Sequence, residues 1–158
     1  MFSRIALSLL LGTSLVLAQG IPDRPEKLSF KALSFKAPRV KDYKTKLKNG
    51  IPVFIAPDPN GQPFVRINVM VRGGSYLDPK GKEGLAEFVG DLMRSGGTEK
   101  TPADKLDERV EFLAAQIRSN FGDTDGNVFL EILKQDFEKG LALFMEVLTQ
   151  PAFAQDRL

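Results

Sequence analysis

Two carboxylates one helical turn apart are the residues of this chain whose spacing comes nearest to a metal or acid–base site. Glu87 and Asp91 lie in residues 84–93, GLAEFVGDLM, with Gly90 between them. On a helix, positions i and i+4 share a face, and carboxylate oxygens are ligands for Ca²⁺ or Mg²⁺. The pair is equally typical of a solvated helix face or of a surface that contacts a peptide, so three interpretations stay open.

Histidine and cysteine are absent from all 158 residues. These are the side chains that most often bind zinc. Their absence also excludes Ser-His and Cys-His nucleophilic sites and any disulfide. On composition alone, a hydrolase remains possible only with a Ser-Lys or a carboxylate-only site.

Composition and charge indicate one globular domain preceded by a basic segment. Hydrophobic residues make up 42% and charged residues 27% of the chain, as in ordinary soluble domains with a core. Residues 19–50 contain nine Lys/Arg against three Asp/Glu, whereas residues 51–158 contain twelve against seventeen. A basic arm therefore precedes an acidic domain.

The first 18 residues have the pattern of a secretory signal peptide. Arg4 supplies the positive start, residues 5–17 are apolar, and Val16 and Ala18 suit cleavage after Ala18. The alternative is a membrane anchor, but the apolar run is shorter than the ~20 residues that span a bilayer. We therefore expect an exported chain, periplasmic or extracellular, without a stable membrane anchor.

Residues 19–42 are predicted to form an extended basic arm, because Pro22, Pro25 and Pro38 disfavour a helix. The arm contains a tandem repeat, LSFKA at 28–32 and again at 33–37. We interpret it as a linker or as an arm that lies over a neighbouring surface. Contact with nucleic acid or a membrane is the alternative, but an exported protein seldom meets nucleic acid and we expect none as a partner.

Hydrophobic periodicity from residue 43 onward predicts eight elements. The first strands, 43–48 and 51–56, flank a turn at Asn49-Gly50. The first helix, 82–94, is expected to bury one face while Glu87, Gly90 and Asp91 lie on the other. The elements in order are strands 43–48, 51–56 and 64–72, helix 82–94, a helix that starts at Pro102 with Thr101 as N-cap, strands 116–121 and 127–133, and a helix capped by Asp136.

The face of the first helix that is predicted to be buried carries five apolar residues at helical spacing. They are Leu85, Phe88, Val89, Leu92 and Met93. The element order predicts an α+β fold, in which helices pack on one face of a mostly antiparallel sheet.

Several motifs in fixed order resemble the N-terminal domain of the insulinase/pitrilysin (M16) zinc metallopeptidase family. They are LKNGIPV at 47–53, VRGGS at 71–75, GLA at 84–86, GGT at 96–98 and PAF at 151–153. The resemblance covers residues 43–158. Since family members are much longer and repeat this domain, it also implies that the domain is incomplete here and the chain truncated.

Active family members carry the motif H-x-x-E-H on the first helix, two zinc ligands around a general base. Aligned on residues 84–86, the resemblance places Glu87 at the first His position, Gly90 at the base position and Asp91 at the second His position. All three depart from the motif. The resemblance thus implies a degenerate site, with no catalytic residue, metal ligand or cofactor in this chain, and a third ligand position beyond Leu158.

The chain resembles most narrowly the non-catalytic members of bacterial M16 pairs. That resemblance implies a heterodimer in which a zinc-bearing M16 sister subunit cleaves a peptide substrate and this chain assists peptide binding and proteolysis. The alternative is a structural or assembly scaffold of the same fold without a proteolytic role.

Overall fold

The computed structural model describes residues 24–157 and divides the chain into two compact units, Met1–Ile55 and Ala56–Leu158. The predicted signal peptide at 1–18 and the start of the predicted arm lie outside the described residues. The helices and strands follow the predicted order β-β-β-α-α-β-β-α. No helix of residues 24–157 is long and apolar enough to cross a membrane.

The first unit contains the arm and one hairpin. Residues 28–39 form no helix or strand. Strands β1 (Lys44–Lys46) and β2 (Pro52–Phe54) pair antiparallel. The turn between them holds Gly50 at φ +88°, and the Gly50 amide donates to the Leu47 carbonyl at 2.9 Å. Glycine adopts this left-handed conformation without steric cost, so the predicted Asn-Gly hairpin is confirmed, with shorter strands.

The second unit is built on a three-stranded antiparallel sheet in the order β3-β5-β4. Its strands are β3 (Phe64–Arg72), β4 (Gln116–Phe121) and β5 (Asp125–Leu133). The central strand β5 alternates between buried and half-buried positions, and Val128, Leu130 and Ile132 are fully buried. This period of two puts one face of the sheet into the core.

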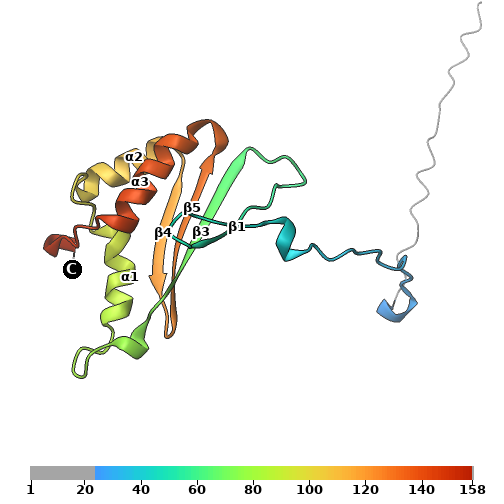
Figure 1. Ribbon diagram of the computed structural model, residues 1–158, viewed down its shortest axis with the longest axis horizontal. Coiled ribbons are helices and arrows are strands. Elements are labelled where there is room, and N and C mark those ends of the chain that lie inside the picture. Colours follow the sequence, from blue (N-terminus) through green and yellow to red (C-terminus); the bar gives the residue numbers. More distant parts are fainter. Residues whose placement is uncertain (1–23, 158) are drawn as a thin grey trace, which may run out of the picture. The chain divides into compact units, whose positions relative to one another are not determined.

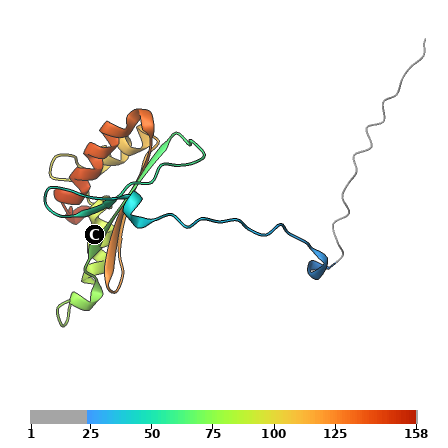
Figure 2. The ribbon, with the colours of Figure 1, turned by 45° about the vertical axis from the view of Figure 1, so that its right-hand side comes forward.

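Three helices pack on that face of the sheet, α1 (Leu85–Ser95), α2 (Ala103–Phe112) and α3 (Phe137–Thr149) (Figures 1 and 2). The core joins the three buried side chains of β5 to apolar side chains of the other elements. The other buried members are Leu106, Val110, Leu113, Ile117, Leu143, Phe144 and Val147. The predicted α+β class, with helices on one face of an antiparallel sheet, is confirmed.

Helix α1 begins at Leu85, three residues later than predicted, because its approach contains left-handed glycines. Gly81 and Gly84 have φ +82° and +92°. The carboxylate of Asp78 accepts hydrogen bonds from the amides of Gly84 (2.8 Å) and Ala86 (3.0 Å). This side chain thus satisfies helix-start amides that have no partner within the helix.

The predicted cap of α2 is wrong. Pro102, not Thr101, occupies the N-cap position of α2, and no side chain caps the helix. The Thr101 hydroxyl instead donates to Glu146 Oε2 of α3 at 3.0 Å. A tertiary partner has replaced the local one.

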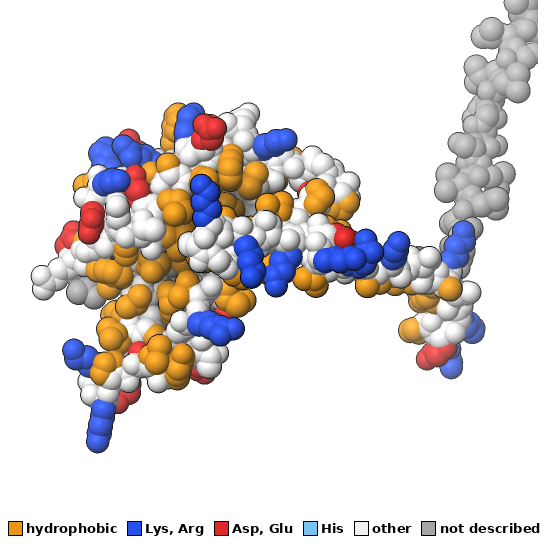
Figure 3. All heavy atoms as spheres, in the orientation of Figure 1, with side chains coloured by type: hydrophobic (Ala, Val, Ile, Leu, Met, Phe, Trp, Pro, Cys, Tyr) orange, Lys and Arg blue, Asp and Glu red, His pale blue; other side chains and the backbone are white. Residues whose placement is uncertain are grey.

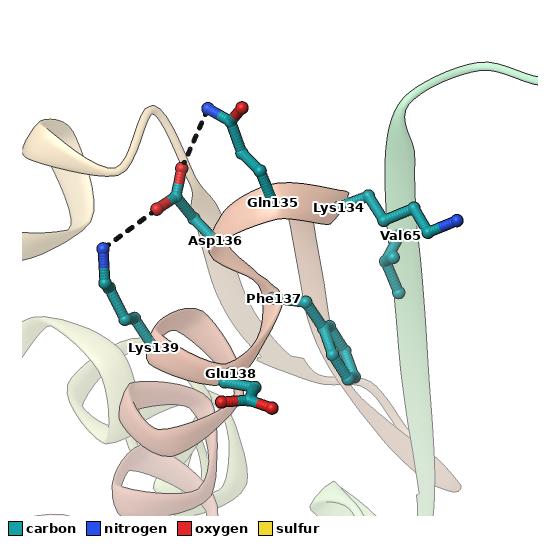
Figure 4. Close-up of a pocket in the computed structure, with 7 residues that line it drawn as sticks. All are labelled: Val65, Lys134, Gln135, Asp136, Phe137, Glu138 and Lys139. Carbon is teal, nitrogen blue, oxygen red and sulfur yellow. Dashed lines mark hydrogen bonds and ion pairs between the residues drawn. The ribbon is translucent and has the colours of Figure 1, made fainter.

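The predicted cap of α3 is correct in position only. Asp136 is its N-cap, but its carboxylate accepts from Lys139 Nζ at 3.2 Å and from Gln135 rather than from a helix amide (Figure 4). Exposed or half-exposed ion pairs of this kind contribute little to stability.

Candidate functional site

The site is built where helix α1 crosses the inner face of β4. Ser119 of β4 donates a hydrogen bond from Oγ to the Gly90 carbonyl at 2.5 Å. Gly90 is buried, and a Cβ built on it would lie 2.7 Å from the Phe121 backbone nitrogen and 3.0 Å from Asn120 Cα. Helix and strand therefore meet backbone to backbone at this glycine.

The burial of Gly90 corrects the predicted orientation of α1. Gly90 was expected on the solvent face together with Glu87 and Asp91, and it lies instead against β4. Leu85 and Phe88, expected in the core, are 43% and 57% exposed. The helix is turned differently from the prediction because glycine has no Cβ, so the β4 backbone can approach α1 closely at position 90.

Glu87 and Asp91 are both exposed, as expected. Neither carboxylate forms a hydrogen bond or an ion pair within residues 24–157. Arg94 does not offset the charge of Asp91 through an ion pair: it pairs with Asp107 of α2 at 2.8 Å. Two unpaired negative charges thus stand on the flank of α1 next to Gly90.

The donor set does not fit zinc. Residues 87 and 91 offer only oxygen atoms, and residue 90 has no side chain that could activate a water molecule. Among the described residues, no group of three or more His, Cys, Asp or Glu could hold a metal ion. A glutamate at position 90 would also need a Cβ within 2.7 Å of the β4 backbone. We therefore derive no metal-dependent step for this chain.

Within residues 24–157 the outer edge of β4 pairs with no other strand, since β4 is a terminal strand of the sheet, and this is the open edge of β4. The Gly122 amide donates to the Asp125 carbonyl at 2.9 Å, and Phe121 pairs with Gly126. Hydrogen-bonded and non-bonded pairs alternate along an antiparallel ladder. The backbone N–H and C=O groups of Ile117, Ser119 and Phe121 consequently point away from β5, along the flank of α1.

A polar latch fixes the segment that follows α1. The hydroxyls of Thr98 and Thr101, both buried, donate to Glu146 Oε2 at 3.0 Å each. Thr98 also forms an isolated bridge with Pro151 after α3. The latch holds the end of α1 against the end of α3, which sets the position of α1 over β4.

Apolar side chains are exposed on α1 and on the turn that precedes it. Figure 3 shows hydrophobic side chains gathered over this part of the molecule, and the members are Tyr76, Leu77, Leu85 and Phe88. The turn is fixed to the β4–β5 hairpin, because the amides of Ser75 and Tyr76 donate to the Gly122 and Asp123 carbonyls. A rigid apolar surface therefore adjoins the open edge.

A hollow of about 400 Å³ at the start of α3 offers no comparable chemistry. It is lined by Val65 and residues 134–139 (Figure 4). Two of its four charged lining residues, Asp136 and Lys139, are paired with each other. We assign no function to it.

Sequence reasoning found Glu87 and Asp91 but missed the role of Gly90 and the latch at Glu146. A signal for Gly90 was present, because an isolated glycine inside a helical pattern costs about 1 kcal/mol relative to alanine. The partners of Glu146 are 45 and 48 residues away. No local pattern marks such a contact.

Comparison with known families now identifies the class. The sequence model described as insulinase (peptidase family M16) matches residues 53–158, more than half of the chain. The chain belongs to the M16 family. An uncharacterized zinc protease of Rickettsia bellii (strain RML369-C) is 25% identical over 117 residues, which cover 72% of this chain and 27% of that protein. The chain thus spans about a quarter of this relative.

Solved structures share the fold. A protease from Helicobacter pylori superimposes with a TM-score of 0.61 at 23% identity, covering 72% of this chain and 27% of that one. A peptidase M16 inactive domain from Pseudomonas fluorescens gives 0.56 at 21% identity, with 61% and 23% covered. Pitrilysin gives 0.58 at 22% identity, with 69% and 12% covered.

Proposed function

We propose that this chain is a non-catalytic M16 subunit that binds extended peptides and works beside a zinc-bearing M16 sister subunit. The carrying observation is the burial of Gly90 against β4 at the position of the family's general base. Glu87 and Asp91 at the two imidazole positions support the same conclusion, since they supply oxygen ligands only. Proteolysis then depends on the zinc of the partner.

The open edge of β4 is the peptide-binding element of this proposal. An extended peptide binds an open sheet edge as an added strand, through main-chain hydrogen bonds. The edge offers outward backbone groups at three residues beside α1. Glu87 and Asp91 favour peptides that carry positive charge near this edge.

Export to the periplasm or the extracellular space belongs to the same proposal. The sequence pattern of residues 1–18 supports it.

The comparisons are consistent with a family that contains both active and inactive domains. One relative of similar sequence is called a zinc protease, and one structure of similar fold is called an M16 inactive domain.

Peptide cleavage with and without a partner tests the non-catalytic role. The full chain and a zinc-bearing M16 sister subunit are purified separately, and cleavage of a fluorogenic peptide is followed for each and for the mixture. We expect no cleavage by this chain alone and faster cleavage by the mixture than by the sister alone. Zinc-dependent cleavage by this chain alone would refute the proposal.

Proline at the sheet edges tests the peptide site. Ser119→Pro removes an outward N–H of β4, and Met70→Pro is its matched control on the opposite edge, β3. We expect Ser119→Pro to weaken peptide binding in fluorescence anisotropy and Met70→Pro to leave it unchanged. Ser119→Ala controls for loss of the hydroxyl bond to Gly90. Equal binding by both proline variants, with folding confirmed by circular dichroism, would exclude the β4 edge.

A scaffold without a proteolytic role is the second candidate, and the exposed apolar side chains of α1 favour it. Such a surface marks contact with another protein. Phe88→Asp discriminates the two functions. If the chain is a scaffold, this variant loses its partner, and neither the natural chain nor the variant changes peptide cleavage by the sister subunit at any concentration. The proposed subunit loses the stimulation of cleavage together with the partner.

A further inference from the structure

The tandem repeat of the arm, residues 28–37, pairs with no strand within the described residues 24–157. Within residues 24–157, no backbone hydrogen bond involves residues 29–37. Phe30 and Leu33 are 80% and 91% exposed. Pro25 and Pro38 lie on either side of the repeat, and no proline interrupts it. All ten of its amides are therefore free of the proline restriction on strand pairing.

Each copy of the repeat has the pattern of a short amphipathic strand. In an extended chain alternate side chains share a face. One face of a copy then carries Leu, Phe and Ala, and the other carries Ser and Lys. Because the period of five is odd, the second copy presents its two faces on the opposite sides. A strand as short as β4, with six residues, can therefore pair with either copy in an equivalent way.

The β4 edge is complementary to such a strand in hydrogen bonding and in charge. It presents outward backbone groups at Ile117, Ser119 and Phe121. Glu87 and Asp91 beside it enter no ion pair among the described residues. The repeat supplies two lysines and no acidic residue.

We propose that the arm of one copy of this chain adds as an edge strand to β4 of a second copy, through either LSFKA unit. Main-chain bonds supply most of the affinity, as in other cases of strand addition, and the lysines lie near the carboxylates of α1. The contact is heterologous, since an arm meets a strand edge, so one contact joins two copies into a dimer and further contacts of the same kind can extend it. Because it uses the edge of the proposed function, the arm competes with bound peptides, and only this competition rests on the proposed function.

Cross-linking between copies tests the contact directly, because the natural chain has no cysteine. A full chain with Ser34→Cys is mixed with a full chain with Asn120→Cys on β4 and treated with a flexible bis-maleimide. The matched control replaces the second chain by Met70→Cys, on the β3 edge. We expect the mixed dimer with Asn120→Cys and much less with Met70→Cys. Equal yields, or none with Asn120→Cys, would overturn the proposal.

Equivalence of the two units gives a second test by analytical ultracentrifugation. Phe30→Asp disables the first LSFKA unit and Phe35→Asp disables the second. Because one of two equivalent units remains in each variant, each should raise the dissociation constant of the dimer about twofold. The double variant should raise it more than about tenfold. A single variant that abolishes the dimer refutes the equivalence. If the arm variants lose binding to anionic phospholipid vesicles while no dimer exists, the arm is a membrane segment and the proposal fails.

The two proposals fail separately. Cross-linking to Asn120→Cys leaves the arm contact intact, and it refutes the peptide-binding role if the Phe30→Asp, Phe35→Asp double variant, whose arm no longer competes for the edge, also binds no peptide. Peptide binding without cross-linking does the reverse.

Discussion

Replacement of Gly90 by alanine probes the contact that sets α1 on β4. The added Cβ would lie 2.7 Å from the Phe121 nitrogen and 3.0–3.1 Å from backbone atoms of Asn120, whereas optimal nonbonded carbon contacts lie near ~3.5–4.0 Å. These neighbours are backbone atoms of a paired strand, so they cannot rotate away. The helix must retreat from β4 by a sizeable fraction of an ångström.

Two opposing effects decide the magnitude. Overpacking of a close contact costs about 1–3 kcal/mol, and retreat also weakens the Ser119–Gly90 hydrogen bond, worth about 1 kcal/mol. Alanine regains about 1 kcal/mol of helix propensity over glycine. We expect the steric cost to win, with a net loss of about 1–2 kcal/mol in the free energy of unfolding. For a domain of this size that lowers Tm by roughly 3–8 °C.

Urea and thermal unfolding of the full chain, followed by circular dichroism, measure this loss. Glu87→Ala and Asp91→Ala are the matched controls on the same helix, and each should stay within about 0.5 kcal/mol of the natural chain because both residues are exposed and unpaired. A Gly90→Ala variant as stable as these controls, or more stable, would refute the packing of α1 on β4.

The same contact predicts that restoring the family motif will not restore activity. The triple variant Glu87→His, Gly90→Glu, Asp91→His supplies the H-x-x-E-H residues, but the side chain at position 90 starts where β4 stands. We expect the triple variant to be less stable than the double variant Glu87→His, Asp91→His, and neither to cleave peptides. Peptidase activity of the triple variant at natural stability would show that α1 has room over β4.

Three further predictions address the latch, the helix–strand bond and one carboxyl pKa. Glu146→Ala leaves the buried hydroxyls of Thr98 and Thr101 without their acceptor and should cost about 2–4 kcal/mol in urea unfolding, whereas exposed Glu138→Ala should change little; equal effects would contradict the latch. Ser119→Ala should cost about 0.5–1.5 kcal/mol and leave the secondary structure unchanged by circular dichroism. The Gly81 amide donates to Glu83 at 3.0 Å and holds the pKa of Glu83 below its ordinary value of 4.5. The stabilising contribution of this hydrogen bond is therefore present above the unfolded-state pKa of Glu83 and is lost as pH falls through the folded-state pKa. A carbon-13 NMR titration of the Glu83 carboxyl would detect the lowered pKa, with Glu83→Gln as the control that assigns the signal.

The order of the elements could be predicted because each has a local cause. Alternation at Val128, Leu130 and Ile132 marks a strand with one buried face, and Asn49-Gly50 marks a hairpin. These signals act over a few residues and survive tertiary packing. The family resemblance also rested on motifs with such local turn or helix roles, and the matched range 53–158 bears it out.

The orientation of α1 could not be predicted in the same way. Helical periodicity identifies the buried face from the positions of apolar side chains, so the predicted buried face included Leu85 and Phe88. Gly90 has no side chain and contributes nothing to that average, yet it determines which face meets β4. The cap of α2 failed for a related reason, since the Thr101 hydroxyl finds Glu146, which is distant in sequence.

Under the proposed function, the departures from the family motif at positions 87, 90 and 91 affect packing as well as chemistry. With Gly90 against the backbone of β4, the helix occupies space that a general base would need, and the contact itself contributes to stability. A change back toward the active motif must first pay the packing cost of separating α1 from β4. Substitutions at 87 and 91 alone meet no such barrier, because both positions face solvent. Under the proposed function, the absence of a general base and the packing of α1 on β4 coincide at position 90, and substitution toward the active motif should cost most stability at this residue.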